Sequence, residues 1–216
     1  MEWLELLREA APVMLRGAGY TVLFALAAML GGFPVAVLRL LSYRWLSWPA
    51  GVYVSLMRGT PLLVQMFVIY YGLPSIGIEF TPVTAGILAL SLNSGAFLSE
   101  SLRGAIGAIS KGQWAASFSL GLGYWATLYY VVLPQALRVA VPAMSNTLIS
   151  LIKDTSLVSV ITLTELMLST KEVIATTFQP LPLYLAAAAI YWMLSLLFEA
   201  LQRRMEQRLN RAHHSR

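Results

Sequence analysis

Few side chains in this 216-residue chain could do chemistry, and most of them stand inside long apolar runs. The sequence has no G-x-x-x-x-G-K-[ST] phosphate loop, no H-E-x-x-H zinc motif and no G-x-S-x-G nucleophile elbow. Cysteine is absent, and the two histidines, His213 and His214, stand together in the tail, where a solvated end is expected rather than a metal site. We therefore expect no catalytic residue, no metal site and no ATP hydrolysis by the chain itself.

One apolar run carries a stripe of polar residues at helical spacing. Asn146, Ser150 and Lys153 follow an i, i+4, i+7 pattern. Thr147, Ser150 and Asp154 follow an i, i+3, i+7 pattern, so together the two sets form one polar stripe along a helix.

Two other apolar runs carry polar pairs seven residues apart, which share a helix face: Arg58 with Gln65, and Asn93 with Glu100. Each of these residues alone could simply join helices to one another. Burying charged groups in hydrocarbon is costly, however, and three helices that each bring polar groups favour a shared internal cavity. We predict a substrate pathway lined by Arg58, Gln65, Asn93, Asn146, Thr147, Ser150 and Asp154.

Charge balance predicts how the charged members of these stripes pair. Adjacent residues on a helix do not face each other, so Lys153 and Asp154 are expected to find partners on other helices. We predict a buried charge network in which Arg58 or Lys153 meets Glu100 or Asp154.

The composition is typical of a membrane protein. Hydrophobic residues make up 58% of the chain and charged residues 12%, which is about half the charged share of a soluble domain. We expect an all-α polytopic membrane protein that forms a single domain over residues 1–216.

Five apolar runs approach the length that a transmembrane helix needs. The second is interrupted by Gly59-Thr60-Pro61, which must break helical hydrogen bonds at membrane depth. The fourth crosses only if it continues through Lys153 and Asp154, and residues 165–182 are then expected to form an external excursion. The five predicted spans cover residues 17–38, 49–73, 80–99, 139–160 and 183–198.

Basic residues predict the orientation of the spans, because short basic loops stay in the cytoplasm. Arg39 and Arg44 follow the first run, and five of the 15 Lys and Arg residues stand in the tail, residues 203–216. Five spans then place the N-terminus outside and the C-terminus in the cytoplasm, with residues 1–11 as an interfacial helix. No aromatic residues interleave the basic tail, so we interpret it as a membrane-surface segment and expect no nucleic-acid partner.

The predicted cytoplasmic loop, residues 103–138, contains a stretch too short to cross a bilayer. A Gly-Leu-Gly sequence at 121–123 divides it into two short helical pieces. Ser110 is placed to cap the first piece. The stretch also carries an apolar stripe with aromatic residues, formed by Trp114, Phe118 and Leu122. Such a stripe fits a groove, either in this chain or in another protein.

Four segments resemble the permease subunit of ABC importers for polar amino acids. They are RGTPLLVQMFVIYYGLP (58–74), LSLNSGAFLSESLRGAI (90–106), KGQWAASFSLGLGYWATLYYVVLPQALR (111–138) and SLIKDTSLVSVITLTEL (150–166). The resemblance covers most of the chain and implies the type I ABC importer fold in a bacterial cytoplasmic (inner) membrane. It also implies a pair of ATPase subunits that bind ATP and Mg, a second permease copy or a sister permease, an extracytoplasmic binding protein, and no cofactor on this chain.

The resemblance assigns residues 103–138 to the loop that couples the permease to the ATPase. The family's motif begins Glu-Ala-Ala, whereas this chain has Ala115-Ala116-Ser117, so a carboxylate contact is missing here. The implied ATPase-coupling residues are Lys111, Gln113, Trp114, Phe118, Gly121 and Leu122.

The implied substrate is a polar L-amino acid. Relatives that import arginine or histidine often carry a glutamate where this chain has Thr147, and the segments 69–80 and 201–211 look most like cystine permeases. We expect cystine or another neutral polar amino acid. The alternatives are a permease for basic amino acids and, from other classes, a non-transporting membrane scaffold or an intramembrane enzyme that uses Glu100 or Asp154.

Overall fold

The computed structural model describes residues 2–41 and 44–214, and the regular structure of these residues is helical. By length and composition, three helices could cross a membrane: α1 (Glu2–Leu41), α4 (Pro82–Gly107) and α9 (Pro180–His214). Two pairs of bent helices raise the number of candidate spans to as many as five. The prediction of an all-α polytopic membrane fold is confirmed.

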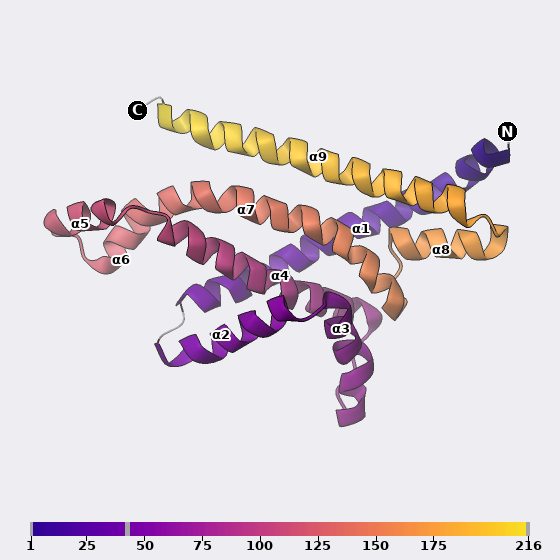
Figure 1. Cartoon of the computed structure of the whole chain (residues 1–216), viewed down its shortest axis with the longest axis horizontal. Coiled ribbons are helices and arrows are strands. Elements are labelled where there is room, and N and C mark those ends of the chain that lie inside the picture. The colour runs from indigo at the N-terminus through magenta and orange to yellow at the C-terminus, as the bar shows by residue number, and fades with distance from the viewer. Residues whose placement is uncertain (1, 42–43, 215–216) are drawn as a thin grey trace.

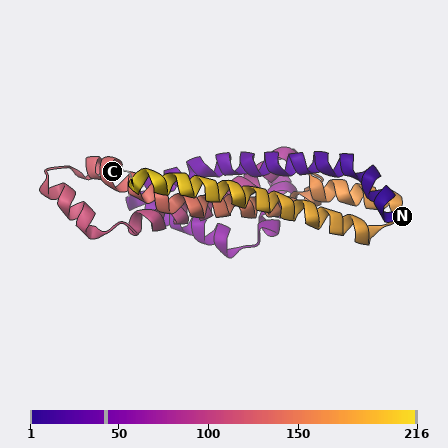
Figure 2. The ribbon, with the colours of Figure 1, turned by 90° about the horizontal axis from the view of Figure 1, so that it is seen from above.

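The long helices lie beside one another along the longest axis of the molecule (Figures 1 and 2). The C-terminal end of α9 lies at the same end as the short helices α5 (Lys111–Ser119) and α6 (Tyr124–Thr127). The N-terminus lies at the opposite end, beside α8 (Leu166–Thr177). The predicted coupling loop and the basic tail therefore share one end of the bundle.

Helix α1 is a single helix that contains Pro12 and Pro34. Residues 2–11, which we predicted as a separate interfacial helix, are its first turns, and their position at a membrane surface stays a prediction. Further along, α1 approaches α4 closely: a Cβ atom on Gly32 would collide with Ser94 Oγ and would lie 2.9 Å from the carbonyl oxygen of Ser91. Small residues at this crossing allow the two backbones to meet.

The second predicted span is broken where the sequence indicated. Helix α2 (Arg44–Gly59) ends before Thr60-Pro61, and the segment that follows turns by 110°. That segment consists of α3 (Leu62–Phe67), the π-helix η1 (Val68–Gly72) and the 3₁₀-helix η2 (Leu73–Ile76), and it points away from the bundle (Figure 1). Residues 49–73 are thus not one straight span, because Pro61 is extended and lacks the N–H that would continue the helix.

The fourth predicted span continues past its two charged residues, as expected. Helix α7 (Leu133–Asp154), which follows η3 (Leu128–Val132), leads directly into the 3₁₀-helix η4 (Thr155–Ile161). The chain then turns at Thr162, which has a φ of 60°, and enters α8.

The first part of the expected external excursion, residues 165–182, is a packed helix, and its position outside the membrane stays a prediction. Glu165 is fully buried, and α8 packs against α1 and α9. The backbone N–H of Leu168 and the hydroxyl groups of Thr21 and Tyr191 all donate hydrogen bonds to the Glu165 carboxylate. A charged residue that looked like part of a loop is therefore the buried N-cap of a packed helix.

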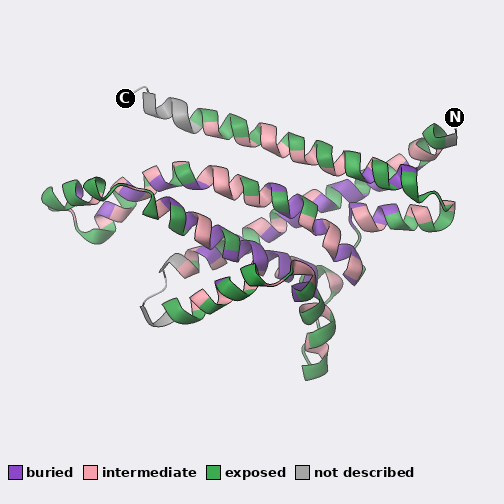
Figure 3. Cartoon of the chain, in the orientation of Figure 1, coloured by how far each residue is buried: buried purple, intermediate pink, exposed green. Residues whose placement is uncertain are grey.

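Buried residues form one cluster where α1, α4, α7 and η4 meet and another where α1, α8 and the first turns of α9 meet, whereas α9 is largely exposed along its outer side (Figure 3). The exposed residues of α9 include Leu185, Trp192 and Leu196, which suit contact with lipid or with another membrane protein.

Candidate functional site

The break at residues 59–61 is held together by two side chains from the predicted pathway. Gln65 Nε2 donates to the carbonyl oxygens of Met57 (2.9 Å) and Thr60 (3.1 Å) and to Thr60 Oγ1 (2.9 Å). Asn93 Nδ2 donates to Gln65 Oε1 (3.1 Å) and to the Met57 carbonyl oxygen (3.2 Å). Both side chains are buried, and they satisfy carbonyl groups that the interrupted helix leaves free.

The polar stripe of α7 lines a pocket of about 410 Å³ against α4. Of the seven predicted pathway residues, the structure brings five together here: Asn93, Asn146, Thr147, Ser150 and Asp154. Gln65 does not line the pocket, and Arg58 does not line it either. Sequence reasoning missed the further lining residues Ser94, Phe97 and Leu151. Phe97 could have been found, because it stands four residues after Asn93 and so on the same helix face.

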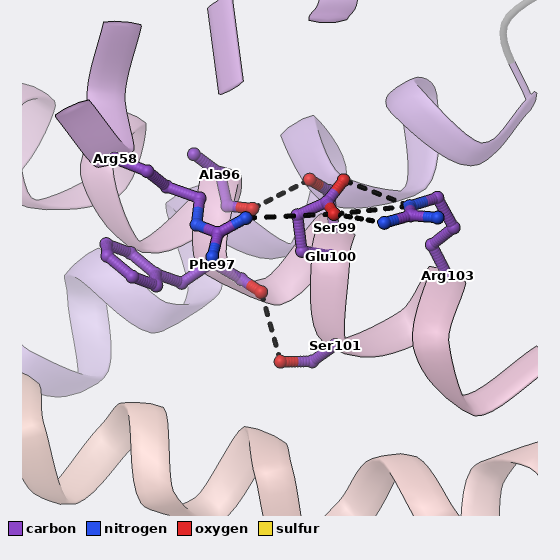
Figure 4. A network of polar contacts seen from close by, with 7 residues as sticks. All are labelled: Arg58, Ala96, Phe97, Ser99, Glu100, Ser101 and Arg103. Carbon is purple, nitrogen blue, oxygen red and sulfur yellow. Dashed lines mark hydrogen bonds and ion pairs between the residues drawn. The ribbon is translucent and has the colours of Figure 1, made fainter. Parts of the chain in front are cut away.

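Arg58 lies beside this pocket, against one of its walls. Its guanidinium carbon lies 5.6 Å from the ring centroid of Phe97, within the range of a cation–π interaction. On its other side, Arg58 Nη1 lies 3.7 Å from Glu100 Oε2, so one of the predicted charge pairs is present (Figure 4).

Glu100 has a second partner that the sequence reasoning did not predict. Arg103, one turn further along α4, donates from Nη2 to Glu100 Oε2 at 2.5 Å and from Nε to both carboxylate oxygens (Figure 4). The ion pair of Arg58 with Glu100 is less buried than the predicted network, since the two side chains are 47% and 20% exposed. Within the described part of the chain, Lys153 and Asp154 form no ion pair within 4.0 Å, so the four charges do not make one network.

The two short helices of the predicted coupling loop form a hairpin around Gly121. This glycine has a φ of +81°, a conformation that costs other residues energy. The Trp114 ring stacks on Tyr124 at 5.5 Å between centroids and lies 6.1 Å from the Phe118 ring. Trp114 therefore braces the hairpin, whereas Phe118 and Leu120 are exposed on it.

Two expectations about this hairpin need adjustment. Ser110 stands at the N-cap of α5, but its side chain makes no capping hydrogen bond. Leu122 lies beyond the end of α5, so it does not continue the stripe of Trp114 and Phe118 on that helix. Gln113 Oε1 accepts a hydrogen bond of 3.3 Å from Gln135 Nε2 and so ties α5 to α7, while Lys111 is exposed.

The described residues contain no group of three or more His, Asp and Glu side chains that could hold a metal ion. The side chains of His213 and His214 lie outside the part of the chain whose side chains are described.

Comparison with known proteins places this arrangement among transport proteins. A family model described as "Binding-protein-dependent transport system inner membrane component" matches residues 28–211. The probable amino-acid ABC transporter permease protein YckA of Bacillus subtilis is 40% identical over 204 residues, which cover 93% of this chain and 90% of YckA. The L-cystine transport system permease protein TcyB of the same organism is 42% identical over 205 residues, with coverages of 93% and 88%.

The fold is shared with a solved transporter. A chain in the crystal structure of an amino acid ABC transporter with histidines superposes with a TM-score of 0.90 at 32% identity. The superposition covers 96% of this chain and 99% of that one. The likeness thus spans nearly the whole of both chains.

Proposed function

Because this chain belongs to the family of inner membrane components of binding-protein-dependent transport systems, and is the permease subunit of an amino-acid ABC importer, we propose that it carries cystine or another neutral polar L-amino acid. It is a multi-pass protein of the bacterial inner membrane. It is not itself an ATPase and binds no cofactor, since ATP is handled by a partner ATPase, and a binding protein is its other partner.

The observation that carries the proposal is the pocket between α4 and α7. Amide and hydroxyl groups line it together with one carboxylate, Asp154, and one ammonium, Lys153. These two opposite charges match the ammonium and carboxylate groups of a zwitterion, while Asn146, Thr147 and Ser150 can bind a polar side chain. Its volume of about 410 Å³ is within the range of small-molecule sites.

The polar face of α7 argues for a second permease. Asn146, Ser150 and Lys153 are exposed on this helix at membrane depth, where contact with lipid would be costly. We infer that a second copy of this chain, or a sister permease, covers this face and closes the pathway.

A permease for histidine or another cationic amino acid is the second candidate. The solved transporter with histidines favours it, and Asp154 could neutralise a cationic side chain. The neutral candidate is supported by Thr147, which offers no counter-charge, and by the 42% identity to TcyB.

The α5–α6 hairpin is the proposed contact with the ATPase. It exposes Phe118 and Leu120, and Ala115 stands where the family has a carboxylate, so a carboxylate contact with the ATPase is missing at this position. The basic C-terminal tail lies at the same end of the bundle (Figure 1). This shared end is the proposed cytoplasmic side, which leaves the N-terminus outside.

Reconstitution tests this function. The permease is placed in proteoliposomes with its ATPase and binding protein, and ATP-driven uptake of labelled L-cystine is measured with L-glutamine, L-histidine or L-arginine as competitors. Uptake that neutral amino acids inhibit supports the proposal. Uptake that only arginine and histidine inhibit supports the second candidate, and a complex that imports no L-cystine would overturn cystine as the substrate.

A further inference from the structure

A second pocket, of about 670 Å³, lies at the hairpin end of α7. Its wall is formed by the start of α5, by η3 and by the first turns of α7. The residues that matter for the argument are Gln113, Tyr130, Pro134, Gln135, Arg138 and Val139.

Arg138 is the charged group of this lining, and it makes no hydrogen bond or ion pair with any described residue. The neighbouring Gln135 is engaged, because its Nε2 donates to the Val131 carbonyl oxygen (2.8 Å) and to Gln113 Oε1 (3.3 Å). Arg138 is half-buried, and its guanidinium donors are therefore free to bind a ligand.

The pocket lies on the same face of α7 as the pocket proposed to hold the substrate. A line of residues spaced four, three, four and four positions apart on α7 connects the two pockets. Residues three or four positions apart lie on the same side of a helix. The residues along this line are Gln135, Val139, Pro142, Asn146 and Ser150. Arg138 and Asn146 are eight residues apart, which corresponds to about 12 Å along the helix axis.

We propose that this second pocket is an exit station, where Arg138 binds the carboxylate of an amino acid that leaves the pocket between α4 and α7. This inference rests on the proposed function and adds a second binding step to it. A guanidinium binds a carboxylate through two parallel hydrogen bonds. The same positive charge repels a cationic side chain, so the station favours neutral amino acids.

The absence of cysteine allows a clean test, because one introduced thiol is the only thiol in this chain. Val139→Cys places it in the pocket, at a position where the native side chain is 49% exposed. Leu137→Cys is the matched control: it is 43% exposed and nearby but does not line the pocket. Both variants are assembled with the ATPase and binding protein in vesicles of uncharged lipid.

The first measurement reports the charge in the pocket. Methanethiosulfonate reagents that carry either a sulfonate or a trimethylammonium group are compared at each thiol. The measured quantity is the rate at which the sulfonate reagent modifies the thiol, divided by the rate for the trimethylammonium reagent. We expect this ratio to be about fivefold higher at Val139→Cys than at Leu137→Cys. Adding Arg138→Gln should remove the difference. Equal rate ratios at Val139→Cys and Leu137→Cys would overturn the proposal of an exit station.

The second measurement reports the ligand. Millimolar L-glutamine added on the cytoplasmic side should slow modification of Val139→Cys by about fivefold, the α-amide of L-glutamine should not, and Arg138→Gln should abolish the protection. Leu137→Cys should be unprotected throughout. Protection by phosphatidylglycerol vesicles but not by L-glutamine would assign the pocket to lipid and overturn the proposal.

The two proposals fail in different ways. If the transporter imports no amino acid at all, the proposed function is wrong, whatever the thiol rates are. If wild-type import is normal but L-glutamine gives no protection, the exit station alone is wrong.

Discussion

Asn93 Nδ2 donates a hydrogen bond of 3.1 Å to Gln65 Oε1, which joins the middle of α4 to the helical break at residues 59–61. The bond also holds the side-chain amide of Gln65 in place, and the Nε2 group of this amide donates to the carbonyl oxygens of Met57 and Thr60. Two polar residues that the sequence suggested for transport thus have a structural task at the break, and only Asn93 also reaches the pocket.

Replacing Gln65 with leucine should destabilise the permease. The change leaves the Thr60 carbonyl oxygen without this donor and the Met57 carbonyl oxygen with Asn93 Nδ2 alone, and we expect a loss of about 2 kcal/mol in the free energy of unfolding. Denaturant titration in detergent measures it. Val64→Leu, at the exposed preceding residue, should be close to neutral. Equal stability of the two variants would mean that other groups satisfy the carbonyls.

Replacing Glu100 with glutamine should affect transport more than stability. Because the ion pairs with Arg58 and Arg103 are partly exposed, the free energy of unfolding should fall by less than about 1 kcal/mol. Arg58 would lose the carboxylate that holds it beside Phe97 and the pocket, so uptake should fall.

A double-mutant cycle with Arg58→Gln and Glu100→Gln isolates the 3.7 Å pair from the contribution of Arg103. Uptake rates of the four proteins are the measurement. Strictly additive effects on uptake, or unchanged uptake in Glu100→Gln, would count against a role of this pair.

Replacing Glu165 with glutamine should also destabilise the protein. The amide oxygen can still accept from the Leu168 N–H, but the amide nitrogen cannot accept from the hydroxyl groups of Thr21 and Tyr191. We expect a loss on the order of 2 kcal/mol, and about 1 kcal/mol for Tyr191→Phe. Thermal unfolding in detergent measures both. The control is Tyr184→Phe on the same helix, at a more exposed position, which should change little.

Replacing Gly121 with alanine should weaken coupling to the ATPase. The residue has a φ of +81°, so alanine is strained there by about 1 kcal/mol even though its Cβ meets no atom within 4 Å. Gly123→Ala is the matched control, because Gly123 has a φ of −73° and equally open surroundings. ATPase activity stimulated by loaded binding protein should fall in the first variant only. A similar loss in both would show that backbone strain is not the cause.

The class of this protein and the positions of its helices and of their main break could be predicted from its amino-acid sequence. Apolar length, charge and helical spacing are local properties, so they were enough to predict the membrane fold, the break at residues 59–61 and the polar stripe of α7. They also placed Asn146 and Ser150 on one face, because the geometry of a helix is the same whatever surrounds it.

The contacts between different helices could not be predicted in this way and follow from the packing of the folded chain. This packing turned the segment after Pro61 by 110°, buried Glu165 against Thr21 and Tyr191, and brought Arg58 of α2 beside Glu100 of α4. It also left Arg138 without a polar partner among the described residues. Spacing along one helix cannot predict these contacts, because each depends on how separate helices pack and on which polar groups they bring within hydrogen-bonding distance.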